Sequence, residues 1–183
     1  MTVTPVDYEL LLPEGWFRVG VEPESRERSV DALVDRRFGG ADNVPHLKRR
    51  LREELLAQAA AAYDQGGIEL YLSMQQAGAL TVPASLLVTL LPPGSVTEAA
   101  DASAVELAAG TAVRRRGCAG AGRGDGETLP SVTLDYQVPV PGTGAHLLLT
   151  FSTPLVQIAD TMVELFDAVA GSLRWRAGSS GRE

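Results

Sequence analysis

The residue with the most distinctive chemistry is the single cysteine, Cys118, which follows three consecutive arginines at 114–116. Nearby cations favour the thiolate form of a cysteine, so this spacing is compatible with a reactive or redox-sensing thiol. No histidine or aspartate stands beside Cys118 in the sequence. We therefore interpret it as an incidental thiol at the mouth of a glycine-rich loop. One cysteine cannot form an internal disulfide, so nothing here requires an oxidising compartment.

The two histidines, His46 and His146, are far apart in the sequence and belong to no metal-binding motif. Zinc sites gather three or four histidine, cysteine or carboxylate ligands at characteristic spacings, which one cysteine and two scattered histidines do not supply. The sequence therefore predicts no metal site and no cofactor.

A glycine-rich stretch at residues 117–127 has five glycines in eleven residues and invites comparison with a phosphate-binding loop. It lacks the GxGxxG spacing and the Gly-Lys-Ser/Thr ending of such loops. A predicted strand follows it, so no helix N-terminus is available to receive a phosphate. Its Arg-Gly-Asp tripeptide at 123–125 would be an adhesion motif only in an extracellular protein. We expect a mobile hairpin linker.

Acidic residues are the remaining candidates for acid–base chemistry. Asp160, Glu164 and Asp167 follow i, i+4, i+7 spacing on a predicted helix, opposite its apolar face. That pattern is typical of a solvated helix surface, and like charges four residues apart are mildly destabilising. No nucleophile elbow, Ser-His-Asp order or metal triad accompanies these residues. We identify no catalytic residue and expect that the protein is not an enzyme.

Positive charge is concentrated in one part of an acidic chain. Nine of the sixteen lysine and arginine residues lie between Arg18 and Arg52, and none lies between Glu53 and Val113. Several stand in the first half of a predicted helix, where the helix dipole disfavours cations. We define the basic patch as Arg36, Arg37, Lys48, Arg49, Arg50 and Arg52. It would dock an acidic protein partner or a phosphorylated ligand; alternatively, its members pair with nearby carboxylates on a solvated face.

Length and charge bound the class of protein. A chain of 183 residues, 45% of them hydrophobic, can bury a core, and we expect one domain at 1–176 and a disordered tail at 177–183. The net charge of −7 argues against a nucleic-acid partner. No signal peptide is visible and no apolar run is long enough to span a membrane, so we expect a cytoplasmic protein. All but one of the basic residues are arginine, which suggests a bacterial genome rich in G and C.

Hydrophobic periodicity divides the chain into strands and helices. Strands are predicted at 8–12, 16–21, 68–74, 80–91, 106–116, 132–138 and 146–152, the fifth of them weak and interrupted by Gly110. Helices are predicted at 25–38, from Pro45 to about Tyr63, and from 155 to 175. Thr153 or Ser152 would cap the last helix, with Pro154 at its start.

The order of these elements favours an α+β fold. Strands that follow one another through short turns favour an antiparallel sheet, and helices grouped before and after them argue against a doubly wound fold. Residues 86–91 and 147–149 are apolar at consecutive positions, which is typical of strands covered on both faces. We therefore expect an α/β/α sandwich in which helices cover both faces of one antiparallel sheet.

This order of elements resembles the Mog1/PsbP/DcrB-like superfamily. The resemblance rests on an opening strand followed by Leu-Pro-Glu-Gly-Trp at 12–16, and on a final strand that enters a helix through Ser-Thr-Pro at 152–154 and ends in Leu-Arg-Trp at 173–175. It implies a sandwich around an antiparallel sheet and a binding or assembly-assisting role. The chain differs by inserting two helices between Ser25 and Tyr63 and by lacking a visible secretion signal. No functional residue carries over.

Two classes of function remain after these exclusions, and an enzyme is kept as a further alternative. The first is a bacterial accessory protein, adaptor-like or chaperone-like, that docks another protein through the basic patch or an exposed sheet edge; a homodimer is also open. The second is a carrier of a small hydrophobic ligand between the sheet and the last helix. That pocket would be lined by Tyr71, Met74, Phe151, Met162 and Phe166. An enzyme using this pocket would have Asp135, Tyr136 and His146 as its polar candidates.

Overall fold

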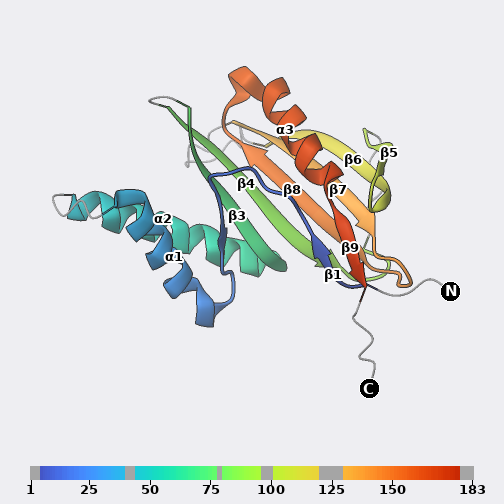
Figure 1. The fold of residues 1–183 in the computed structure, drawn as a ribbon, viewed down its shortest axis with the longest axis horizontal. Helices are drawn as coiled ribbons and strands as arrows, with labels where there is room; N and C mark the ends of the chain where they lie inside the picture. The colour runs from blue at the N-terminus through green and yellow to red at the C-terminus, as the bar shows by residue number, and fades with distance from the viewer. Residues whose placement is uncertain (1–4, 40–43, 78–79, 96–100, 120–129, 178–183) are drawn as a thin grey trace. The chain divides into compact units, whose positions relative to one another are not determined.

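The chain folds as an α+β protein. The computed structural model describes residues 5–39, 44–77, 80–95, 101–119 and 130–177 (Figure 1). Within these ranges it has a seven-stranded antiparallel sheet of order β2-β3-β4-β8-β7-β6-β5, a two-stranded sheet of β1 and β9, and three α-helices. The chain divides into two compact units, unit 1 with residues Met1–Pro13 and Leu90–Glu183, and unit 2 with residues Glu14–Thr89. The predicted fold class is confirmed.

Unit 2 packs two helices against one face of a three-stranded segment. Its elements are β2 (Trp16–Val19), α1 (Pro23–Phe38), α2 (Pro45–Asp64), β3 (Gly67–Ala77) and most of β4 (Leu80–Leu91). Strand β3 pairs antiparallel with both β2 and β4. The buried core consists of Val19, Val21, Val30, Leu33, Val34, Leu55, Ala59, Ala62, Leu70 and Leu72. These side chains come from both helices, from β2 and β3, and from the segment between β2 and α1, so burial of apolar area holds the layers together.

The turn that leads into β2 requires a glycine. Gly15 has φ 88°, and a Cβ built there would lie 3.1 Å from the Cα of Gln75 on β3. Its carbonyl accepts a hydrogen bond from the Met74 amide at 2.8 Å. A side chain would therefore strain the backbone and disturb the pairing of β2 with β3.

Unit 1 is built on four strands of the large sheet and one helix. These are β5 (Ser103–Leu107), β6 (Gly110–Ala119), β7 (Ser131–Pro139), β8 (His146–Thr153) and α3 (Ala159–Gly171), which follows a single 3₁₀ turn at Val156–Ile158. Helix α3 packs on β7 and β8. Side chains along β7 and β8 alternate strictly between the two faces of the sheet. The face that α3 covers buries Val132, Leu134, Tyr136, Val138, Leu147, Leu149, Phe151 and Thr153.

The opposite face of the same strands is polar and half-buried. It carries Thr133, Asp135 and Gln137 of β7, which alternate with the buried residues. Among the described residues of unit 1, α3 is the only α-helix, and it lies on the other face. Coverage of both sheet faces by helices therefore stays a prediction.

The C-terminal helix is shorter than the sequence predicts. We expected a helix through Trp175, but α3 ends at Gly171 and the chain forms β9 (Arg174–Ala177), which pairs antiparallel with β1 (Pro5–Glu9). Ser172 lies where the helix ends and the segment to β9 begins. Its hydroxyl donates to the Val169 carbonyl at 2.6 Å and accepts from the Leu11 amide at 2.9 Å. The final residues of the described chain thus pair with the N-terminal strand and form a second sheet.

At the other end, α3 begins at Ala159 after the 3₁₀ turn and has no side-chain cap among the described residues, so the predicted cap by Thr153 or Ser152 is wrong. The Thr153 hydroxyl instead accepts from the Leu155 amide at 3.2 Å, before the 3₁₀ turn.

The predicted strand at 106–116 is also wrong in its bounds. Gly110 does not interrupt one strand but begins β6 with φ 122°, opposite Leu107 at the end of β5, so the two strands form a tight hairpin. Cys118 lies in β6 rather than at a loop mouth. Residues 117–119 of the loop predicted at 117–127 lie in β6, and Ala177, the first residue of the tail predicted at 177–183, ends β9. The rest of the predicted loop and tail lies outside the described residues, and the single domain at 1–176 stays a prediction.

Candidate functional site

The structure divides the basic patch into neutralised and free cations. Arg52 lies 2.6 Å from the Asp31 carboxylate and 3.9 Å from Glu27, which links α2 to α1. Arg50 lies 3.0 Å from Glu54, one turn further along α2. Two of the six patch residues, Arg50 and Arg52, therefore form ion pairs with nearby carboxylates. On an exposed surface such pairs contribute little to stability.

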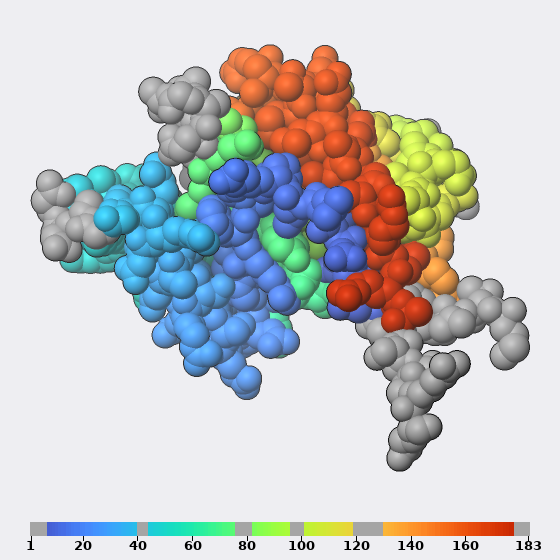
Figure 2. All heavy atoms as spheres, viewed as in Figure 1, coloured from blue at the N-terminus to red at the C-terminus, as the bar shows by residue number. Residues whose placement is uncertain are grey.

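The other four patch residues have no carboxylate partner within the described ranges. They are Arg36, Arg37, Lys48 and Arg49. The Arg36 guanidinium instead lies 4.8 Å from the centre of the Phe17 ring. The first turn of α2 has no acidic residue and no side-chain cap, so Lys48 and Arg49 add to the positive end of the helix dipole. Figure 2 shows the surface of α1 and α2, in blue to cyan.

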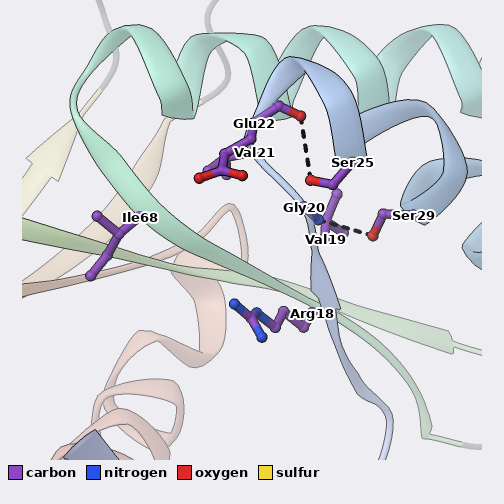
Figure 3. Close-up of a pocket in the computed structure, with 8 residues that line it drawn as sticks. All are labelled: Arg18, Val19, Gly20, Val21, Glu22, Ser25, Ser29 and Ile68. Atoms are coloured by element: carbon purple, nitrogen blue, oxygen red, sulfur yellow. Dashed lines mark hydrogen bonds between the residues drawn. The ribbon is translucent and has the colours of Figure 1, made fainter. Parts of the chain in front are cut away.

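A cavity of about 420 Å³ opens at the start of α1 (Figure 3). Its polar groups are already engaged with one another. The Gly20 amide donates to the Ser29 hydroxyl at 2.9 Å, and the Ser25 hydroxyl donates to the Glu22 carbonyl at 3.4 Å. Arg18 lies 2.7 Å from the carboxylate of Glu69. The Gly20–Ser29 bond joins the end of β2 to α1, and the Arg18–Glu69 pair joins β2 to β3, so we interpret this cavity as a structural joint.

A second cavity, of about 300 Å³, lies on the polar face of unit 1. The strand register arranges most of its wall in two rows. Arg115, Asp135 and Thr150 face one another across β6, β7 and β8, and the next row consists of Val113, Gln137 and Leu148. Ala102 completes the wall. One row is charged and the other largely apolar, about 7 Å apart along the strands.

Two polar atoms on this face lack hydrogen-bond partners. The Oε1 atom of Gln137 and the Nδ1 atom of His146 are buried and have no partner among the described residues. His146 pairs with Pro139, one row beyond Gln137 on the same face. A buried polar atom without a partner costs about 1–3 kcal/mol, so native structures keep few of them. Of these two residues, Gln137 lines the second cavity and His146 does not.

The carboxyl group of Asp135 is electrostatically perturbed. Burial raises the pKa of Asp135, and the hydrogen bond from Thr150 and the charge of Arg115 only partly oppose this. A raised pKa in the folded state means that ionisation of Asp135 destabilises the fold. The protonated form of Asp135 therefore favours the folded state. This stabilisation is fully present below the ordinary pKa of an aspartate and is lost as pH rises through the raised pKa of Asp135.

Asp135→Asn should therefore stabilise the protein at neutral pH. We expect the free energy of unfolding to rise by about 0.5–1 kcal/mol at pH 7, because the amide keeps the shape without the buried charge, and the gain should vanish near pH 3. Urea denaturation at the two pH values measures it, with the exposed Asp160→Asn as control. A variant less stable than the wild type at pH 7 would contradict the assignment.

The residues predicted to line a hydrophobic pocket are placed in different parts of the chain. Phe151, Met162 and Phe166 lie in unit 1, where they are 0–3% exposed and the rings of Phe151 and Phe166 stack 4.9 Å apart. Tyr71 and Met74 lie on β3 in unit 2 and, three residues apart on a strand, point to opposite faces. Neither cavity described above is lined by any of the five. The hydrophobic carrier stays a prediction.

The polar candidates for an enzyme do not converge either. Asp135 and His146 lie on the polar face, whereas Tyr136 is 1% exposed beneath α3. The Tyr136 hydroxyl donates to Asp167, which also accepts from Arg114 at 2.8 and 3.1 Å. The Asp167 side chain is thus partly solvated, at 41% exposure, and also bonds α3 to the sheet.

Other predicted residues carry little further chemistry. Cys118 is exposed, and the neighbouring Arg116 lies 2.8 Å from Asp160. His46 is exposed in the first turn of α2. Over the described ranges, histidine, cysteine and carboxylate side chains form no group of three that could hold a metal ion. Within the same ranges, no helix is long and apolar enough to cross a membrane.

The sequence reasoning missed Arg115, Gln137 and Thr150. The signal was present, because the clean alternation at 132–138 places Asp135 and Gln137 on one face and apolar residues on the other. Comparisons with protein-family models, with curated proteins and with solved structures find no match for this chain. The Mog1/PsbP-like resemblance stays a prediction.

Proposed function

We propose that this protein is a non-enzymatic binding module that docks an acidic segment of another protein through the basic patch. The observation that carries the proposal is the set of four cations, Arg36, Arg37, Lys48 and Arg49, that have no carboxylate partner among the described residues. On a chain of net charge −7, this local excess of positive charge favours an acidic partner and steers its approach.

An apolar side chain within the patch favours a protein segment over a simple anion. Leu47, beside Lys48 on α2, is 44% exposed although its four-residue spacing from Leu51 and Leu55 is typical of the buried face of a helix. An exposed leucine next to Lys48 would contact an apolar residue of an acidic segment. With this function we also propose a bacterial, cytoplasmic accessory protein, which the single cysteine and the arginine-rich composition support.

Charge reversal tests the docking surface. The probe is a fluorescein-labelled peptide of alternating glutamate and leucine residues, followed by fluorescence anisotropy. We expect saturable binding that weakens as salt increases, and a loss of about tenfold or more in affinity in the Lys48→Glu, Arg49→Glu double variant. Both residues are surface groups, so the variant should fold.

The matched control is Arg174→Glu with Arg176→Glu on β9, because it changes the net charge by the same amount at two other exposed arginines. The proposal requires that this control retains most of the binding. Equal losses in the two double variants would assign the effect to overall charge and overturn the patch. The absence of peptide binding by the wild-type protein would overturn the docking function itself.

A further inference from the structure

The polar face of unit 1 holds a built cavity that the docking proposal does not use. Arg115, Asp135 and Gln137 contribute its polar wall, and Val113 and Leu148 its apolar wall. All of them lie on three adjacent strands whose register is continuous, so the rigid part of the sheet fixes their spacing. Sites on such elements are better preorganised than sites on loops.

The charged row offers opposite charges that do not satisfy one another. The Nε atom of Arg115 lies 4.0 Å from the Oδ2 atom of Asp135, which is too long for a hydrogen bond. The guanidinium therefore keeps donors for an incoming anion, and the carboxylate, which Thr150 also contacts, keeps acceptor positions for an incoming cation. A ligand with both charges on neighbouring atoms matches this pair.

The second row adds an amide side chain and an apolar surface. Gln137 presents an amide whose buried oxygen has no donor among the described residues, next to Asp135 along β7. Val113 and Leu148 flank Gln137 on the neighbouring strands, and Val113 is 39% exposed. A cationic N–H group at the Asp135 carboxylate would lie beside the Gln137 side chain, while an aliphatic chain would cover the two apolar side chains.

We propose that this cavity binds a free α-amino acid with an aliphatic side chain. Its carboxylate contacts the Arg115 guanidinium, its ammonium group contacts the Asp135 carboxylate, and its side chain packs on Val113 and Leu148. The cavity volume, about 300 Å³, is at the lower end of the range for small-molecule sites, as a ligand of this size requires. The site shares no residue with the basic patch, so either proposal can fail alone.

Calorimetric titration of the wild-type protein with L-leucine tests the class of ligand. We expect saturable binding at concentrations up to about 10 mM, with about tenfold or more loss of affinity for 4-methylpentanoate, which lacks the ammonium group, and for 3-methylbutylamine, which lacks the carboxylate. Because the protein is unchanged, folding cannot explain a difference between ligands. Absence of saturable binding of L-leucine, or equal binding of the three compounds, would overturn the proposal.

Two variants and one control test the place of binding. Arg115→Gln and Asp135→Asn should each weaken L-leucine binding by about tenfold, since each removes a charged contact. Arg116→Gln should bind as the wild type does, because Arg116 neighbours Arg115 on β6 but pairs with Asp160 on the side of α3. Thermal unfolding of each variant checks that it is folded. Unchanged affinity in both test variants would place the ligand elsewhere and overturn the site.

Discussion

Replacement of Phe166 by alanine should lower the free energy of unfolding of unit 1 by about 3–5 kcal/mol. Phe166 is fully buried on α3, and its ring stacks on Phe151 of β8 with 19° between the ring planes. The truncation removes apolar contacts and leaves a cavity between helix and sheet. Trp175 reports on unit 1, because its indole N–H donates to the Ala109 carbonyl at 2.9 Å in the same unit. Urea denaturation followed by tryptophan fluorescence measures the change.

Two controls separate packing from other effects. Phe166→Leu, which keeps most of the volume, should cost about 1–1.5 kcal/mol, and the exposed Glu164→Ala should stay within about 0.5 kcal/mol of the wild type. The experiment also decides between the packed core and the hydrophobic carrier. If Phe166→Ala cost less than about 1 kcal/mol, the interface would be loosely filled, and a ligand pocket at Phe151, Met162 and Phe166 would become the better interpretation.

Local periodicity predicts the elements of this fold well where one face of an element is buried. The helix with Pro45 in its first turn was predicted to end near Tyr63 and ends at Asp64. The prediction is close because the apolar side of this helix packs on the sheet of unit 2, so its periodicity is clear in the sequence. The strands at 132–138 and 146–152 were predicted within about one residue of β7 and β8. In each case the pattern of burial is local, so the sequence carries it directly.

The C-terminal strand depends on a partner that local periodicity does not contain. Leu173 continues the apolar spacing of the preceding helix and is fully buried, so the sequence favours a longer helix. The chain instead forms β9, because β1, more than 160 residues earlier, supplies the hydrogen-bond partner. Such a long-range pairing overrides local helix propensity.

The candidate sites also combine features that the sequence predicts with features that depend on three-dimensional pairing. The basic patch was identified from charge spacing alone, but which cations stay free depends on Asp31 and Glu27 of the neighbouring helix. The cavity at Arg115 and Asp135 needed the register of β6 with β7, which a single sequence does not specify. Spacing therefore predicted where charge gathers, and three-dimensional pairing decides which charges remain available to a partner.

Replacement of Asp167 by alanine should lower the free energy of unfolding by about 2 kcal/mol. The Asp167 carboxylate accepts two hydrogen bonds from Arg114 and one from the buried Tyr136 hydroxyl, and so fastens α3 to β6 and β7. Hydrogen bonds to a charged group contribute about 1.5–3 kcal/mol, and the 41% exposure of the Asp167 side chain reduces their combined effect. The alanine variant also leaves the Tyr136 hydroxyl without its acceptor in a buried place.

Asp160→Ala is the matched control, because Asp160 lies on the same helix and pairs with Arg116 at 2.8 Å, but its side chain is 88% exposed. We expect that loss to stay below about 0.5 kcal/mol, since solvent replaces an exposed partner. A double-mutant cycle with Arg114→Ala should give a coupling energy of about 1 kcal/mol or more between Arg114 and Asp167, as expected for directly bonded residues. Equal losses in Asp167→Ala and Asp160→Ala, with no coupling to Arg114, would show that α3 is held by its apolar face alone.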